Sequence, residues 1–269
     1  MNNDFVIQKP SDIYLQSLVE YYFFIDISVE DLKLKTEHIL PFPRITFGYF
    51  FDYPFLVTNH TLKESAKAEI VISKISTDKI SIKPLTERVK ILGTHIKPYA
   101  LAFFTNENIS HLPWLIKTPD LFKTRAISFV KAIKKCTSPK QMFEEVENAF
   151  LDTIIPKDLS TIIQAVELIE KSNGNICISD ISKEMGISGR TLRNHFYRNI
   201  GCSPKEYIHL LKVKQIVQQM KDSDDLLTSI SYSQNYSDQA HFTNSVKNIT
   251  GFSPKEIRKK IPDFRFLQF

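Results

Sequence analysis

One stretch of sequence occurs twice in the last third of this chain, and it constrains the fold more than any other feature. The segment Gly186-Ile187-Ser188, continued by Gly201-Cys202-Ser203-Pro204-Lys205-Glu206, returns as Asn235-Tyr236-Ser237, continued by Gly251-Phe252-Ser253-Pro254-Lys255-Glu256. The offset is 49 residues at the start and 50 at the end, so the second copy contains one extra residue. Such a repeat indicates that one supersecondary unit is used twice.

Each copy predicts two helices joined by a tight turn. Gly186 and Asn235 stand at the turn, and both residue types accept the positive φ that a tight turn requires. Ser188 and Ser237 follow as predicted N-caps, because a serine hydroxyl accepts a hydrogen bond from a free amide of the next helix. The chain therefore predicts two helix-turn-helix units.

Helical patterns surround and connect these units. We predict helices over residues 159–172, 179–185, 189–199, 204–220, 228–234 and 238–249, and a last one beginning at Pro254. The 17 residues from 204 to 220 would span about 25 Å. With the flanking turns, the second helices of the two units would lie about 34 Å apart, one turn of duplex DNA.

The second helix of each unit carries side chains suited to a major groove. Arginine reads guanine, asparagine and glutamine read adenine, and threonine offers a methyl or a hydroxyl. An ordinary solvated helix face is the alternative for either copy alone, and two copies at this spacing favour DNA. Positive charge supports this weakly, with 16 Lys and Arg against 12 Asp and Glu from residue 157 onward. The candidate DNA-contacting residues are Arg190, Thr191, Arg193, Asn194, Gln239, Thr243, Asn244 and Lys247.

The first part of the chain has a β pattern. Residues 39–51, 69–75, 79–82, 89–96 and 100–105 predict short strands, which suggests a small sandwich or barrel. The aromatic clusters 21–24 and 49–51 either line an apolar pocket or, as we favour, form the core. Helices are predicted over 119–135 and 138–154, with Ser138 and Pro139 as the start signal of the second.

We therefore expect an α+β chain in three parts. Residues 1–112 form a β-rich sensor or dimerisation domain, 113–156 a helical linker or dimerisation segment, and 157–262 a DNA-binding domain. Buried stripes are expected on both second helices, from Leu192, Phe196 and Ile200 in the first and Phe242, Val246 and Ile249 in the second.

At these residues the sequence resembles the AraC/XylS family of transcription regulators. The first half of the family signature is matched by Ile178 to Phe196 and Gly201 to Tyr207, and the second half by Asn235 to Phe242 and Thr250 to Pro254. The resemblance implies a seven-helix domain with base contacts from Arg190, Arg193, Asn194, Gln239, Thr243 and Asn244. Asn235 and Val246 depart from the usual glycine and phenylalanine. The N-terminal part, through Ile39-Leu40-Pro41 and residues 91–98, is similar to the cupin-like β-barrel sensor domains of such regulators.

The expected function is sequence-specific binding of double-stranded DNA, controlled by a small-molecule effector or by dimerisation. RNA polymerase and a second copy of the chain are further candidate partners. The alternative is a cupin-like enzyme with an appended helical domain. It would need a metal or acid–base set, and the histidines at 38, 60, 95 and 111 include no His-x-His pair, so we predict no metal, cofactor or catalytic residue. Residues 1–5 predict no secretory signal and no stretch is long enough for a membrane helix, so we expect a cytoplasmic protein.

Overall fold

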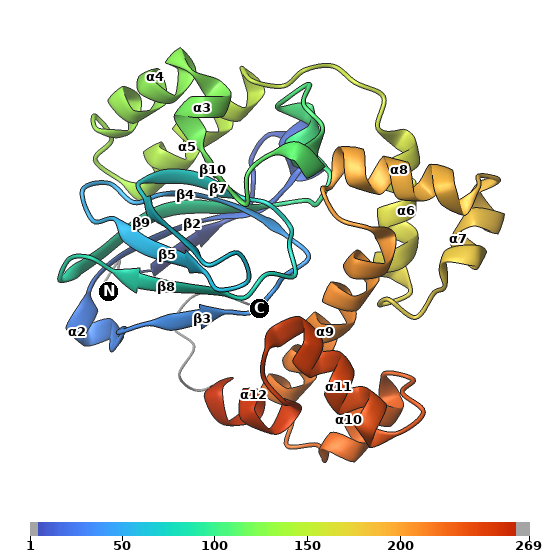
Figure 1. Ribbon diagram of the computed structural model, residues 1–269. Coiled ribbons are helices and arrows are strands. Elements are labelled where there is room, and N and C mark those ends of the chain that lie inside the picture. Colours follow the sequence, from blue (N-terminus) through green and yellow to red (C-terminus); the bar gives the residue numbers. More distant parts are fainter. Residues whose placement is uncertain (1–4, 262–269) are drawn as a thin grey trace.

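The structure is a computed structural model that describes residues 5–261. Two antiparallel sheets form one part of the molecule, and a series of helices forms the other (Figure 1). This arrangement confirms the α+β fold class. Residues 1–4, on which the prediction of a missing secretory signal partly depends, and residue 262, the predicted end of the DNA-binding domain, lie outside the described residues.

Ten strands in the described residues form two facing sheets. The larger sheet has the order β1-β2-β9-β4-β7-β10 and the smaller β3-β8-β5-β6, and neighbouring strands in both are antiparallel. The strands are β1 (Phe5–Gln8), β2 (Val19–Ser28), β3 (Glu37–Ile39), β4 (Ile45–Tyr49), β5 (Phe55–Asn59), β6 (Glu64–Ala68), β7 (Ile70–Ser73), β8 (Ile80–Pro84), β9 (Arg88–Ile96) and β10 (Leu115–Lys117).

Side-chain alternation along the strands separates two cores. On β2, Phe23 and Ile25 point between the sheets, whereas Tyr22 and Phe24 point to the outer face, which helices cover. The aromatic clusters 21–24 and 49–51 are thus divided: Tyr22, Phe24 and Tyr49 lie in the core beneath the helices, and Phe23 and Phe50 line a cavity between the sheets. Gly48 and Gly93 lie opposite each other on β4 and β9, and a Cβ at Gly93 would lie 2.2 Å from the Phe23 ring. The absence of a Cβ at Gly93 therefore leaves room for the Phe23 ring between the sheets.

The predicted strand over residues 100–105 is wrong. Ala100–Phe103 is a 3₁₀ helix, η1, and its four residues are buried. It follows Pro98 directly after the last residues of β9, and its amides bond locally, from Ala102 to the Tyr99 carbonyl and from Phe104 to that of Leu101. An apolar run of this length is compatible with a strand and with a buried turn of helix, so the sequence alone does not distinguish them. A second 3₁₀ helix, η2 (Ile109–His111), follows.

Helices cover the outer face of the larger sheet. The predicted helix 119–135 is interrupted at Lys123, where φ is +49°, and forms α3 (Thr118–Phe122) and α4 (Thr124–Ile133). The next helix, α5 (Pro139–Leu151), begins as predicted with the Ser138 hydroxyl accepting from the Gln141 amide. Phe143 of α5 stacks on Tyr22 of the sheet at 5.8 Å. The predicted helical segment 113–156 also contains the edge strand β10. Two single-turn helices, α1 (Ile13–Gln16) and α2 (Val29–Leu32), flank β2.

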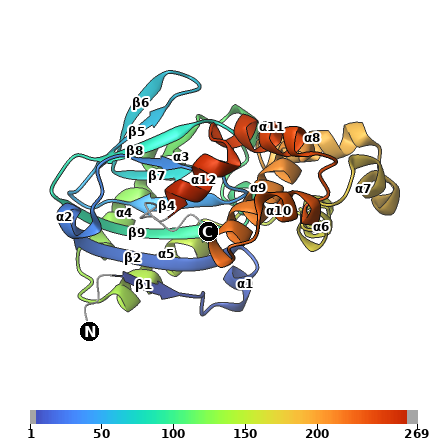
Figure 2. The same cartoon turned by 90° about the horizontal axis from the view of Figure 1, so that it is seen from below.

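Seven helices follow in the described residues after 159, as the family resemblance implies. They are α6 (Ser160–Lys171), α7 (Ile178–Met185), α8 (Gly189–Asn199), α9 (Pro204–Asp222), α10 (Leu227–Ser233), α11 (Gln239–Thr250) and α12 (Pro254–Lys260). Helix α9 joins a group around α8 to a group around α11, and it passes beside the open end of the two sheets (Figures 1 and 2). None of the described helices has the length and apolarity needed to cross a bilayer.

Candidate nucleic-acid interface and its neighbouring cavity

The first helix-turn-helix unit has the predicted turn and cap. Helix α7 ends at Gly186, whose φ of +64° is left-handed. The Ser188 hydroxyl accepts a hydrogen bond from the Thr191 amide at 3.1 Å, so α8 begins directly after Ser188. The Thr191 hydroxyl lies 2.9 Å from the Ser188 hydroxyl, which ties this side chain to the cap.

The second unit has the same turn with a different cap. Asn235 takes the left-handed conformation with φ +59°, as predicted. The predicted cap Ser237 is wrong, because the Asp238 carboxylate accepts from the His241 amide at 2.7 Å and α11 begins after Asp238. The extra residue of the second copy therefore lies in the turn, and the caps Ser188 and Asp238 are 50 residues apart, as are Ser203 and Ser253.

The predicted buried stripes are confirmed on α8 and α11, the second helices of the two units. Leu192, Phe196 and Ile200 are fully buried in the first unit, and Phe242, Val246 and Ile249 are buried in the second. Of the candidate DNA-contacting side chains, Thr243 is half-buried, and the others are exposed, namely Arg190, Thr191, Arg193, Asn194, Gln239, Asn244 and Lys247. With the corrected offset, Arg193 and Asn194 correspond to Thr243 and Asn244, so the two helices present different sets to solvent.

The linker helix α9 sets the separation of the two units. It is 19 residues long and so spans about 28 Å, slightly more than predicted. Its start is fixed by a capping box in which Ser203 and Glu206 bond each other's backbone amides, and Ser253 and Glu256 repeat this box at α12. Figure 2 shows α8 and α11 along the same border of the helical part.

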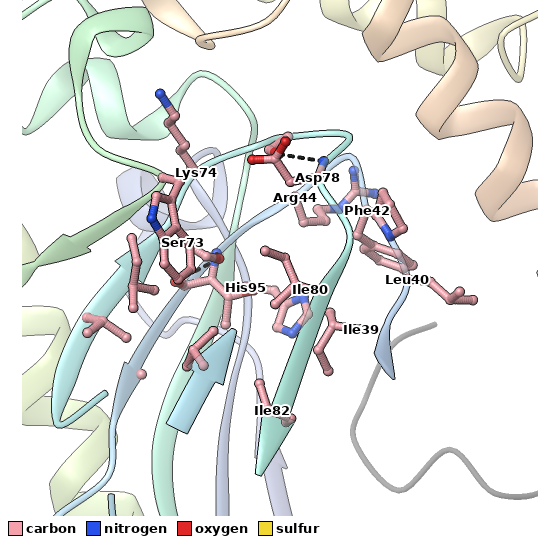
Figure 3. Close-up of a pocket in the computed structure, with 18 of the residues that line it drawn as sticks. Ile39, Leu40, Phe42, Arg44, Ser73, Lys74, Asp78, Ile80, Ile82 and His95 are labelled. Atoms are coloured by element: carbon pink, nitrogen blue, oxygen red, sulfur yellow. Dashed lines mark hydrogen bonds between the residues drawn. The ribbon is translucent and has the colours of Figure 1, made fainter. Parts of the chain in front are cut away.

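A cavity of about 230 Å³ lies between the two sheets. Its wall is mainly apolar, and it opens towards the side where the helical part lies (Figure 3). Both sheets contribute, through Phe23, Gly48 and Val71 from the larger and Val57, Ile80 and Ile82 from the smaller.

Three basic side chains line this cavity, and they differ in charge and in the groups that they contact. His95 is 7% exposed and stacks on Tyr21 with ring centroids 5.0 Å apart, and burial lowers its pKa to about 4, so it is neutral at physiological pH. The Lys74 ammonium donates to the carbonyls of Leu112 at 2.6 Å and Ser110 at 3.3 Å. Arg44, whose side chain is 8% exposed, stands at the mouth beside Phe42 (Figure 3).

Arg44 also belongs to an ion cluster that joins the sheets to the helical part. Its Nε lies 2.5 Å from the Glu20 carboxylate of β2 and its Nη1 lies 3.3 Å from that of Glu170 on α6. The Tyr207 hydroxyl of α9 donates to Glu170 at 2.9 Å, and Lys97 lies 3.6 Å from Glu20 and 3.8 Å from Glu170. Burial alone would raise the pKa of Glu20, but the charges of Arg44 and Lys97 hold it below its usual value.

Further contacts hold the two helix-turn-helix units against the sheets. Ile109 of η2 packs on Gly201, just after α8, and Phe252, just before α12, meets His38 of β3 edge-on at 5.3 Å. On α9, the Lys214 ammonium lies 5.3 Å from the centre of the Phe42 ring. The segment between α5 and α6 is also anchored, because the Lys157 ammonium donates to the carbonyls of Ala102 and Thr105.

The ion cluster was not predicted from the sequence, and an apolar pocket was only the less favoured interpretation of the aromatic clusters 21–24 and 49–51, of which Phe23 and Phe50 line the cavity. One signal was available for Arg44, which is the single charged residue in the aromatic run 39–51 and so had to be exposed, paired or functional. Among the described residues, no three His, Cys, Asp or Glu side chains gather in a way that could hold a metal ion.

Comparison with known proteins supports this description of the helical part. A family model described as a helix-turn-helix domain matches residues 181–260. The HTH-type transcriptional activator RhaS of Escherichia fergusonii is 30% identical over 79 residues, which are 29% of this chain and 28% of that protein. The chain thus matches less than a third of the length of the curated relatives.

Likeness to solved structures extends over nearly the whole fold. ToxT from Vibrio cholerae superposes with a TM-score of 0.53 and 12% identity over 96% of this chain and 98% of that chain. A second ToxT structure, bound to (E)-4-(8-methylnaphthalen-1-yl)but-3-enoic acid, gives a TM-score of 0.50 and 13% identity over 96% and 99%.

The fold and the two helix-turn-helix units together define a protein with a β-sandwich part and a double helix-turn-helix part. The two turns, the two capping boxes and the matched helix-turn-helix model support the resemblance of the C-terminal part to the AraC/XylS family.

Proposed function

We propose that this chain is a sequence-specific transcription regulator that reads two successive major-groove segments of duplex DNA through α8 and α11. The observation that carries the proposal is the pair of exposed recognition helices at the two ends of one linker helix. Arg190, Arg193, Asn194, Gln239, Thr243 and Asn244 read bases, and Thr191 and Lys247 contact the backbone or flanking bases.

The three parts of the chain have separate proposed roles. Residues 157–262 are the proposed DNA-binding domain, 1–112 the sensor and 113–156 the connecting segment. A second copy of the chain and RNA polymerase are proposed partners, and the cytoplasm is the proposed place of action. The proposal contains no catalytic step, metal or cofactor. Elemental analysis of the purified protein tests this, because stoichiometric iron, zinc or manganese would favour an enzyme.

Selection from a random duplex library tests the sequence-specific binding. We expect enrichment of one motif with two half-sites about one helical turn apart. Arg193→Ala should weaken binding to that motif by about 1–3 kcal/mol, because a bidentate contact with guanine is lost. Arg125→Ala, on the exposed face of α4, is the matched control and should bind as the unaltered protein does. Equal affinity for every sequence at physiological salt would contradict the proposal.

The cavity between the sheets is the proposed effector site. Its wall is apolar and its mouth carries Arg44, which suits a molecule with an apolar body and one acidic group. The ToxT structure with a naphthyl butenoic acid bound supports this choice of ligand class by analogy. That acid should raise the melting temperature of this protein in a concentration-dependent way, since a ligand that binds only the folded state stabilises it.

A further inference from the structure

Arg44 lies between the cavity and the helical part of the molecule. One side of the guanidinium belongs to the cavity mouth, and the other contacts the helical part through Glu170. Its contact within the β-sandwich, to Glu20 at 2.5 Å, is short, whereas its contact across to α6 is longer at 3.3 Å. The electrostatic attraction of Arg44 to Glu170 is therefore the weaker of the two, and a competing anion displaces Glu170 more readily than Glu20.

The charge around Arg44 attracts a further anion. The cluster holds two carboxylates, Glu20 and Glu170, and three cationic side chains, Arg44, Lys97 and Lys214. Tyr207 adds no negative charge, because burial and the neighbouring Glu170 raise its pKa well above its ordinary value. An acidic group that enters the cavity mouth thus meets a net positive charge in a water-poor surrounding.

Glu170 is also the point at which two helices are held together. It accepts from Tyr207 of the linker helix while it pairs with Arg44 of the β-sandwich. A change at Glu170 therefore reaches α6, which precedes the first helix-turn-helix unit, and α9, which joins both units. The same docked arrangement fixes the ends of both units, at Gly201 and at Phe252.

We propose that Arg44 is the coupling residue of the regulator: an acidic ligand in the cavity competes with Glu170 for its guanidinium and so loosens the docking of α6 and α9 on the β-sandwich. This inference rests on the proposed function of cavity and recognition helices. Loosening frees the two units to adjust their separation to successive grooves, and the affinity for DNA rises.

The substitution Glu170→Gln tests the coupling without any ligand. It removes the charge while a similar side-chain shape and the hydrogen bond from Tyr207 can remain. Glu167→Gln, one turn earlier on the same helix and exposed, is the matched control. Circular dichroism establishes that both variants are folded, and fluorescence anisotropy measures their affinity for the selected DNA motif. We expect E170Q to bind about five-fold tighter or more, and E167Q to bind as the unaltered chain does.

The naphthyl butenoic acid and its primary amide form the second arm. The acid should tighten DNA binding of the unaltered chain and of E167Q by a similar factor, the neutral amide should not, and neither should affect E170Q. Unchanged DNA affinity in E170Q, or a full response of E170Q to the acid, would overturn the coupling. Absence of any specific DNA binding by the unaltered chain is a different result and refutes the proposed function. If the acid produces no thermal shift, the effector class is wrong, and the ligand-free comparison still decides the coupling.

Discussion

His95 shows how one buried side chain links the cavity to stability. It lies in the cavity wall against Tyr21, and burial lowers its pKa from an ordinary 6.5 to about 4. Between these values the unfolded chain binds a proton that the folded chain does not, so stability falls as pH falls from about 6.5 to about 4, and His95 adds no further change below that. The full loss is on the order of 3 kcal/mol.

Urea unfolding at pH 7 and pH 4.5 measures this loss. The control is His95→Phe, which keeps a ring against Tyr21 and removes the titrating group. We expect the difference in unfolding free energy between the two pH values to shrink in H95F. An equal pH dependence in both proteins would show that His95 is not the group responsible.

The helix elements of the C-terminal part could be predicted closely from the sequence, and the strands only in part. Each helix there carries a local signal, such as Gly186 at a stop or Ser203-Pro204 at a start, that acts within one turn. Strands such as β2 and β10 depend on partners far along the chain. Residues 100–105 show that a short apolar run does not distinguish a strand from a buried turn of helix. The cap of α11 was mispredicted because the position of an inserted residue in a turn is decided by hydrogen bonding, here at Asp238.

The candidate site was also predictable only where it depends on local sequence. The exposed positions on α8 and α11 follow from helical periodicity. The cavity depends on residues of two different sheets, such as Gly48 and Val57, facing each other, and the ion cluster on Glu20, Arg44 and Glu170 meeting across two parts of the fold. No local pattern encodes such long-range contacts.

The repeated capping boxes allow a test at the level of elements. In Ser203→Ala and Ser253→Ala, the hydroxyl that accepts from the amide of Glu206 or Glu256 is lost. Each substitution should lower the unfolding free energy by about 1 kcal/mol. Thermal unfolding of the two variants, with exposed Ser229→Ala on α10 as the control, measures the effect. A cost within error of that control would show that the box does not stabilise its helix.

At the scale of the whole molecule, the docking of the first helix-turn-helix unit on the β-sandwich depends on a glycine. Gly201 has φ +94°, and a Cβ there would lie 3.0 Å from the Ile109 side chain and 3.4 Å from its carbonyl oxygen. Gly186 has φ +64° and would meet nothing within 4 Å. Gly186→Ala therefore isolates the cost of a left-handed alanine, about 1 kcal/mol, and Gly201→Ala adds a clash at the interface, for a total of roughly twice that or more.

The difference between the two glycine variants thus reports on the interface itself. Measured by urea unfolding, it should shrink when Ile109→Ala is introduced in both backgrounds, because the clashing methyl is then gone. Equal costs of the two glycine substitutions would mean that α8 and η2 are not in contact in solution. Docking would then be lost from the first unit, and a signal from the cavity could reach the DNA only through Glu170 and the linker helix.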